Sequence, residues 1–239
     1  MKTLFITTLF SLSFFSCAQE SVRGNGNFIT ETRNVSADFN EIESAGAFDI
    51  IINDVPQDGK IKLEGESNIL DKIEVEVQGN TLVIQHKQGY NFFNNSGSVK
   101  VSLNARNLKS LGLSGSGSIT AKGIQKVDDF SASLSGSGEI DAKVSAQNVN
   151  AAISGSGDIR LSGDADKFKV GISGSGDVKA FALNSKDAEI AVSGSGDTEI
   201  TVNGNLTASV AGSGDIHYKG NPAKINAQSG GSGDVIDAN

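Results

Sequence analysis

The 239-residue chain lacks tryptophan and contains only two prolines and one cysteine. A single cysteine excludes a disulfide within one chain, so no such cross-link can stabilise the fold. The sequence also lacks a cluster of basic residues, and 28 acidic residues against 20 basic ones give a formal charge of -8. This charge balance argues against a nucleic-acid partner.

Glycine and β-branched residues are abundant instead. The chain has 29 glycines, and isoleucine and valine together number 38 against 14 leucines. β-Branched side chains favour strands, and glycine suits tight turns. The composition therefore predicts an all-β protein with many short connections.

The first residues are typical of a secretory signal. Lys2 gives a positive start, and the apolar stretch from Leu4 to Phe15 is too short to span a bilayer as a permanent helix. We interpret residues 1–16 as a signal peptide. The mature protein is then expected outside the cytoplasm.

Two cleavage sites compete after this stretch. The small Ser16 precedes Cys17 as in a loose bacterial lipobox, which predicts lipid attachment at Cys17 and a membrane partner through the lipid anchor. Alternatively, Ser16 and Ala18 are the small residues of an ordinary signal-peptidase site, and the mature chain begins at Gln19. The first interpretation predicts an outer-membrane lipoprotein of the cell envelope, and the second a secreted or periplasmic protein.

The strongest signal is an internal repeat of Gly-Ser-Gly with spacings of 18 to 21 residues, which is too regular to arise by chance. The copies begin at Gly115, Gly136, Gly155, Gly174, Gly194, Gly212 and Gly231.

Apolar residues keep a fixed phase to each copy. They precede the first glycine by two, four and six residues, as Leu134, Ala132 and Phe130 do before Gly136, and alternation resumes after the corner with Ile140 and Ala142. Alternation with a period of two is typical of a half-buried strand. Each repeat is therefore predicted to be two short strands joined by a glycine corner.

A unit of about twenty residues cannot enclose a core alone, but stacked units bury one continuous apolar column. The repeat therefore predicts a parallel β-helix with coils of about twenty residues. A weaker apolar position suggests a third short face at Ile124, Val144, Leu183 and Val202.

Domain boundaries follow from this repeat. Residues 17–34 are predicted to hold the lipid attachment and a polar tether, and residues 35–239 a single β-helix domain. Within it, 35–112 are expected to form irregular N-terminal coils and 113–239 the Gly-Ser-Gly coils.

The N-terminal coils have their own alternating segments. Ile61 to Glu66, Ile73 to Val77 and Leu82 to His86 are predicted strands, with Gly79-Asn80 as a two-residue connection. A helical turn within Asn68 to Val77 is an alternative, and Gly89 to Gly97 is the predicted long loop.

The corner residues have a structural explanation. A sharp turn requires a positive φ, and closely stacked backbones leave no room for a Cβ, so glycine is expected at both ends of the corner. The serine between them can hydrogen-bond its own turn or the neighbouring coil.

An acidic residue follows most corners. Glu139, Asp158, Asp177, Asp197, Asp215 and Asp234 are expected to stack in line. We interpret them as turn acceptors for backbone N–H groups. A Ca²⁺ ladder is the alternative, but the calcium-binding repeats of toxins have a nine-residue period that this sequence does not match. No metal site and no cofactor are predicted.

Other chemistry finds little support. His86 and His217 are far apart in sequence, without the ligand spacing of a zinc site, and are predicted to be surface strand residues. Polysaccharide lyases with β-helices use an acidic Ca²⁺ cluster and a cationic base, but Arg106 and Arg160 are the only arginines in the body of this chain. No catalytic residue is predicted, and the chain is not expected to be an enzyme.

The segment Phe39 to Ile52 and the run of Ser-Gly-Ser-Gly-Asp corners resemble the putative auto-transporter adhesin head GIN domain family of Bacteroidetes-type bacteria. The likeness covers roughly residues 36 to 236. It implies a right-handed parallel β-helix, and the family has no established catalytic residues to assign to this chain.

The leading functional hypothesis is a non-enzymatic cell-envelope lipoprotein that presents a rigid β-helix for adhesion or envelope interaction, with an unknown protein or glycan partner. The alternative is a carbohydrate-binding or carbohydrate-cleaving β-helix. A cleft lined by Asp, Asn, Lys and Arg side chains favours the alternative, and a smooth outer face favours the first hypothesis.

Overall fold

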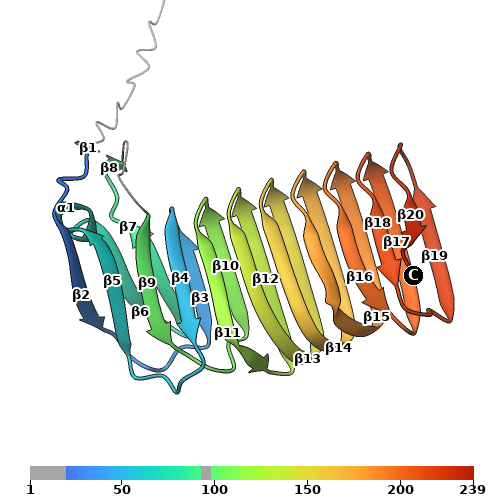
Figure 1. Ribbon diagram of the computed structural model, residues 1–239, viewed down its shortest axis with the longest axis horizontal. Coiled ribbons are helices and arrows are strands. Elements are labelled where there is room, and N and C mark those ends of the chain that lie inside the picture. Colours follow the sequence, from blue (N-terminus) through green and yellow to red (C-terminus); the bar gives the residue numbers. More distant parts are fainter. Residues whose placement is uncertain (1–19, 93–97) are drawn as a thin grey trace, which may run out of the picture.

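The structure, a computed structural model, describes residues 20–92 and 98–239. In these ranges the chain forms twenty strands and one helical turn, wound into a solenoid of about seven turns (Figure 1). Strands of successive Gly-Ser-Gly coils pair in parallel, as β12 (Asp129–Gly136) does with the second half of β13 (Glu139–Gly155). The predicted parallel β-helix is confirmed. No helix in the described part of the chain is long and apolar enough to cross a membrane.

The strands form two faces, which we name by their position relative to the corner. The pre-corner face contains, in stacking order, β6 (Ile73–Gln78), β7 (Thr81–His86), β3 (Glu41–Ala45), β10 (Ser110–Gly115), β12, the second halves of β13, β14 (Asp158–Gly174) and β15 (Val178–Gly194), β17 (Asn205–Gly212) and β19 (Lys224–Ser229). The post-corner face contains β2 (Phe28–Asn34), β5 (Lys60–Glu66), β9 (Val99–Asn104), β4 (Phe48–Asn53), β11 (Ser118–Lys126), the first halves of β13, β14 and β15, β16 (Thr198–Val202), β18 (Ile216–Lys219) and β20 (Val235–Asp237).

The core lies between the two faces and is built from the alternating apolar positions. The column two residues before the first glycine of each corner is buried at Leu113, Leu134, Ile153, Ile172, Val192 and Val210. The third-face position is buried at Val144, Leu183 and Val202, but Ile124 is 38% exposed. In the described residues this position has no strand of its own, because the strand that leaves each corner continues through it.

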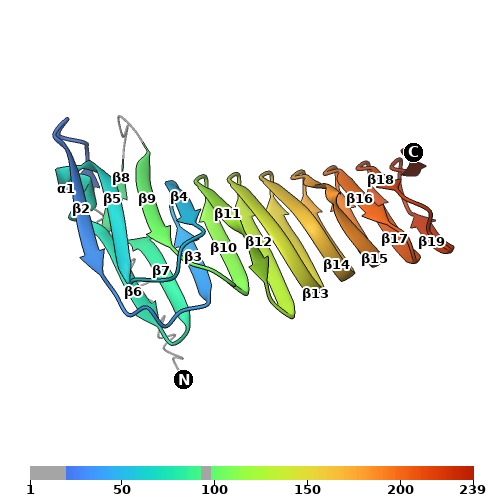
Figure 2. The ribbon, with the colours of Figure 1, turned by 60° about the horizontal axis from the view of Figure 1, so that its bottom comes forward.

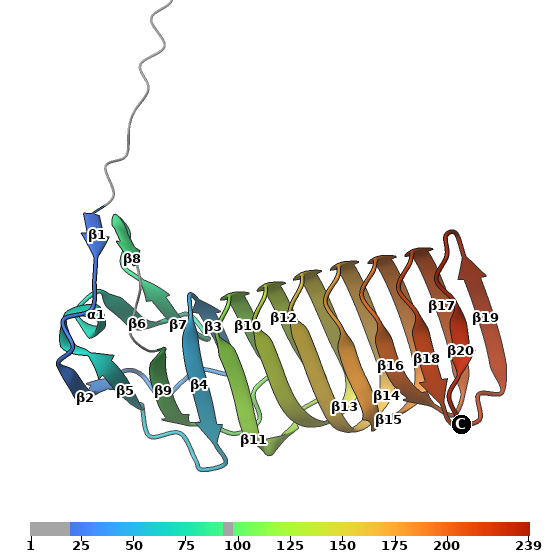
Figure 3. The same cartoon turned by 45° about the horizontal axis from the view of Figure 1, so that its top comes forward.

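The corners stack as the sequence predicts. Pre-corner strands end in a row along one edge of the solenoid (Figure 3). Gly174 has a φ of +130°, and a Cβ on Gly176 would lie 2.1 Å from the carbonyl oxygen of Gly157. The column also contains Gly46, with a φ of +148°, whose carbonyl oxygen lies under Gly115. Gly46 is a corner that the motif did not reveal, because alanines take the place of serine around it.

Stacking order differs from chain order in the N-terminal coils. β3 and β4 lie between the coil of β7 and β9 and the coil of β10 and β11 (Figure 2). Beyond β7 and β9 the pairing becomes antiparallel, at β6 and at β5. The irregular region 35–112 thus contains two complete parallel coils and an antiparallel end cap.

The tether prediction for residues 17–34 is wrong for its second half. Residues 28–34 form β2, which pairs antiparallel with β5. The preceding turn is tied to the cap, because the buried carboxylate of Glu66 accepts the backbone N–H of Gly26 at 2.6 Å. The edge of β5 would otherwise be unpaired, and covering such edges is the usual solution in β-proteins. Cys17 lies outside the described residues.

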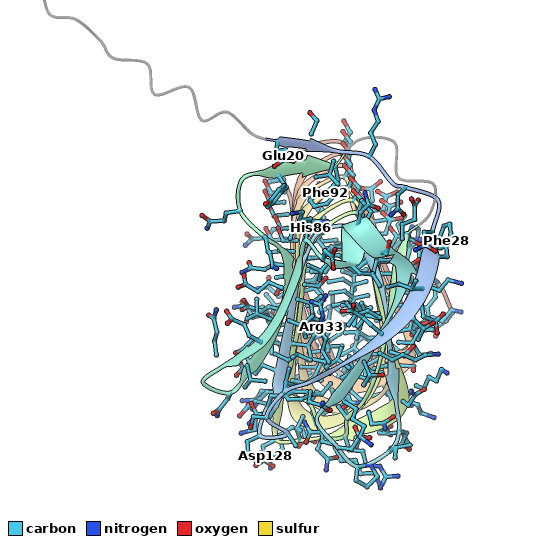
Figure 4. The ribbon with its side chains drawn as sticks, turned by 90° about the vertical axis from the view of Figure 1, so that its left-hand side faces the viewer. Glu20, Phe28, Arg33, His86, Phe92 and Asp128 are labelled. Atoms are coloured by element: carbon cyan, nitrogen blue, oxygen red, sulfur yellow. The ribbon has the colours of Figure 1, made fainter. Side chains whose placement is uncertain are left out.

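The end of the cap is closed by Arg33. Its guanidinium donates to the carbonyl oxygens of Ile73 at 2.6 Å and Leu70 at 2.7 Å. Figure 4 looks onto this end and shows Arg33 over the interior between the two faces. A polar outer surface is what a terminal unit of a solenoid requires.

Both alternatives for residues 68–77 are present in part. α1 (Ser67–Leu70) forms a single helical turn, and β6 follows it and pairs with β7 through the Gly79-Asn80 connection. The predicted loop 89–97 contains β8 (Tyr90–Phe92), which pairs in parallel with β1 (Glu20–Val22). The rest of that loop lies outside the described residues.

Candidate functional site

The candidate site is an open groove of about 900 Å³ on the outer surface of the pre-corner face. It extends from Glu41 on β3 across β10, β12, β13, β14 and β15 to Thr207 on β17. Outward side chains in two columns line it, because they occupy the strand positions that alternate with core residues. The first column is Asp129, Asn148, Lys167, Asp187 and Asn205, and the second is Ser110, Ser131, Asn150, Lys169, Glu189 and Thr207.

Neighbouring coils are linked along these columns by side-chain hydrogen bonds. The amide of Asn148 donates to Asp129 Oδ1 at 2.8 Å, and Lys169 Nζ lies 3.0 Å from Glu189 Oε1. Asp187 Oδ1 accepts from the backbone N–H and the side-chain amide of Asn205, at 2.9 and 2.7 Å. The hydrogen bonds restrain Asp129 and Asp187, whereas the Lys169–Glu189 pair is exposed on both sides.

The hydrogen bonds from Asn205 also lower the pKa of Asp187, its backbone N–H most strongly. Asp187 is therefore an ionised acceptor at neutral pH. The lining of the whole groove contains three lysines and four carboxylates, so it is almost neutral although the protein is acidic. They are Lys109, Lys167 and Lys169, and Glu41, Asp129, Asp187 and Glu189. The aromatic rings of Phe130 and Phe168 belong to the core beneath and are almost fully buried.

Sequence reasoning did not single out this groove. Its residues follow from the repeat, since they lie five and seven positions before the corner glycine and alternate with the buried column. The signal that was missed is that these outward positions carry amide, carboxylate and ammonium groups in successive coils. Close to the corner, by contrast, the outward residues are small, as at Ser135 and Ala152.

The acidic column stacks in line on the post-corner face. Asp177 Oδ1 accepts the backbone N–H of Asp197 at 2.9 Å, and the same bond joins Asp197 to Asp215 and Asp215 to Asp234 at 2.8 Å each. Asp177, Asp197 and Asp215 are therefore acceptors for backbone N–H groups, and each N–H belongs to the turn of the next coil.

Basic side chains offset part of the charge of this column. Lys179 Nζ lies 2.6 Å from Asp158 and 3.6 Å from Asp177, and the hydrogen bond with Asp158 raises the pKa of Lys179. Arg160 pairs with Glu139. Among residues 20–92 and 98–239, no group of three or more His, Cys, Asp or Glu side chains is arranged to hold a metal ion.

The interpretation of His86 as a surface strand residue is wrong. Its ring stacks on Phe92 with 3.9 Å between centroids and contacts Phe48 at 4.7 Å, and this burial lowers the pKa of His86 (Figure 4). Gly46 leaves the space that the imidazole fills. His217 points outward from β18, opposite Glu199, so the two histidines do not meet.

Comparison with known proteins agrees with this fold. The chain has a TM-score of 0.83 and 24% identity to a protein of Bacteroides fragilis described as a putative adhesin, covering 90% of this chain and 98% of that one. A putative lipid binding protein of Parabacteroides distasonis gives a TM-score of 0.72 and 26% identity, covering 91% and 100%. A putative adhesin of Parabacteroides merdae gives 0.71 and 22%, covering 91% and 100%.

No curated protein matches the sequence. The sequence profile of one family, described as putative auto-transporter adhesin, head GIN domain, matches residues 38–222. That range includes the corners from Gly46 to Gly212 and both columns of the groove. The chain belongs to this family.

Proposed function

We propose that this protein is a non-enzymatic adhesin of the cell envelope, anchored by lipid at Cys17, that binds its partner through the groove of the pre-corner face. The groove is the observation that supports the proposal, since it presents polar side chains from seven adjacent strands on an open surface. Membership of a family described as putative auto-transporter adhesin supports binding at the cell surface.

An anchor at Cys17 would determine which end of the solenoid faces the membrane. β1 begins three residues after Cys17 and lies at the cap end of the solenoid, and β19 and β20 lie at the other end (Figure 1). A lipid on Cys17 would hold the cap end close to the membrane. The coils that carry the groove then remain accessible to a partner.

The chemistry of the groove suits binding better than cleavage. General acid catalysis of glycosidic cleavage needs a carboxyl group that keeps its proton near neutral pH. The pKa of Asp187 is shifted in the opposite direction, and Asp129 and Glu189 are held by Asn148 and Lys169. We therefore assign these carboxylates to recognition.

Metabolic labelling with a fatty acid in a Bacteroides host tests the anchor. We expect the wild-type protein to carry the label and to fractionate with the outer membrane. Cys17→Ala should abolish labelling, and Ser16→Ala, which keeps a small residue before the cysteine, is the matched control. A mature protein that begins at Gln19 by intact mass would contradict the anchor and leave the groove proposal standing.

Adherence of whole cells tests the function itself. A strain that lacks the protein should adhere less to mucin, to bare surfaces and to sibling cells than a strain that has it, and wild-type protein should restore the difference. Vesicles of phosphatidylethanolamine provide a further arm, because one relative is described as a putative lipid binding protein. Unchanged adherence to every surface would contradict the adhesin proposal, and so would binding to vesicles alone.

A further inference from the structure

We propose that the groove binds a linear, uncharged glycan that lies along the solenoid axis, with successive sugars over successive coils. This inference rests on the proposed function and identifies the class of partner. Four observations carry it: the repeat distance of the lining, its hydrogen-bonding groups, its charge balance and the pairing of its strands.

The first observation is geometric. Parallel strands repeat at about 4.8 Å, so the outward positions of β10 to β17 form a line of evenly spaced side chains about 24 Å long. Ser131, Asn150, Lys169, Glu189 and Thr207 follow one another along that line in register. A polymer with a short repeating unit can place one unit over each coil, whereas a compact ligand would meet only two or three coils.

The second observation is the chemistry of the lining. Sugar hydroxyls both donate and accept hydrogen bonds, and the groove offers both kinds of partner: carboxylate oxygens at Asp129 and Asp187, ammonium groups at Lys167 and Lys169, and a group of each kind in the amide of Asn150. Hydrogen bonds between coils already restrain Asp129 and Asp187, so binding immobilises fewer free side chains. This preorganisation lowers the entropic cost of binding.

The third observation is charge. Three lysines and four carboxylates leave the groove almost neutral, whereas the acids of the post-corner face form a continuous column. An anionic polymer would meet more carboxylates than ammonium groups in the groove, and a cationic polymer would bind better on the acidic face. The charge balance therefore favours an uncharged ligand.

The fourth observation separates a glycan from an extended peptide. Peptides in extended form bind commonly by adding a strand to a free sheet edge. Every strand of the groove from β10 to β17 is paired on both sides, as β12 is with β10 and β13, so no backbone edge is available there. Recognition must come from side chains, which suits a ligand rich in hydroxyl groups.

Calorimetric titration of the protein with linear oligosaccharides tests the inference. The probes are β-1,4-linked glucose, mannose and N-acetylglucosamine oligomers of two to six units. We expect at least one series to bind, with affinity rising with length as more coils are contacted. Ser131→Trp, which places a large ring in the groove between Ser110 and Asn150, should weaken binding at least tenfold. Thr120→Trp is the matched control on the post-corner face and should leave affinity unchanged.

Thermal unfolding of both variants shows whether each is folded, and Asn150→Ala provides a milder lesion with the same expected direction. Absence of binding by all three series overturns the inference, as does equal loss in Ser131→Trp and Thr120→Trp. The adherence assay separates the two proposals. If Ser131→Trp cells lose adherence while no oligosaccharide binds, the adhesin proposal stands and the glycan proposal fails. Binding of extended peptides to the groove in place of sugars would likewise contradict the glycan proposal and leave the adhesin proposal standing.

Discussion

The carboxylate Oδ1 of Asp197 accepts a hydrogen bond from the backbone N–H of Asp215, 2.8 Å away in the next coil. The same contact recurs between Asp177 and Asp197 and between Asp215 and Asp234. Asp177, Asp197 and Asp215 thus each accept a backbone N–H from the turn of the next coil. Two charges about 5 Å apart in water repel by only about 0.8 kcal/mol. A hydrogen bond of this kind can offset that repulsion, which explains why a column of like charges persists in a stable fold.

Replacing Asp197 separates the hydrogen bond from the charge. Asp197→Asn keeps an oxygen acceptor and should change the free energy of unfolding by no more than about 0.5 kcal/mol. Asp197→Ala leaves the N–H of Asp215 without this partner and should lose about 0.5–1.5 kcal/mol. Urea unfolding of the two variants measures the difference. Equal losses in both would show that the charge, and not the bond, matters.

Calcium should have no specific effect on the column. We expect millimolar Ca²⁺ to raise the unfolding midpoint no more than NaCl at the same ionic strength, because the carboxylates accept backbone N–H groups. Specific binding at a hundred times the dissociation constant would add about 2.7 kcal/mol. A shift that only Ca²⁺ produces, and that Asp177→Asn abolishes, would contradict this prediction.

Substitutions at Gly176, in the corner, and at Gly171, outside it, test how closely the corner backbones stack. A Cβ on Gly176 would lie 2.1 Å from the carbonyl oxygen of Gly157, whereas a Cβ on Gly171 meets no atom within 4 Å. Gly176→Ala should therefore lose about 1–3 kcal/mol or more, because the stacked backbones must move apart. Gly171→Ala should stay within about 0.5 kcal/mol. Chemical denaturation measures both, and similar effects would argue against close stacking at the corner.

His86 should make stability depend on pH. Its folded-state pKa is lowered by burial between Phe48 and Phe92, so the unfolded chain binds the proton first as the pH falls. The contribution of this residue to stability is complete above the unfolded pKa of about 6.5 and decreases as the pH falls towards the folded value. Unfolding midpoints at pH 7.5 and 5.5 should differ less in His86→Phe than in wild type. His217→Phe, on the outer surface of β18, should behave like wild type.

The repeat explains why the Gly-Ser-Gly coils were predictable and the cap was not. Leu134, Ile153 and Ile172 occupy one phase in successive units, and identical units can stack in only a few ways. The cap depends on contacts between segments far apart in sequence, such as Gly26 with Glu66 and Arg33 with Leu70. No local period encodes such contacts, so residues 28–34 resemble a tether in the sequence.

The site was predictable only in part for a related reason. Alternation places Asn148 and Asn150 outside the core, but it does not tell whether the outer surface is flat or hollowed. His86 was misjudged because its environment depends on Gly46, a corner without the serines of the motif, and on Phe92 from β8. Corner and core positions are repeated many times, whereas the cluster of Gly46, His86 and Phe92 occurs once.

Arg33 tests whether the N-terminal segment belongs to the fold. Its guanidinium donates to Leu70 and Ile73 from β2, so Arg33→Ala leaves two carbonyl groups at the end of the core without their donor and should lose about 2 kcal/mol. Arg33→Lys should recover only part of the loss, because one ammonium group does not reproduce the planar fork. Arg106→Ala, which breaks an exposed pair with Asp54, should lose at most about 1 kcal/mol. If Arg33→Ala is as mild as Arg106→Ala, the segment contributes little to stability, and the tether interpretation regains support.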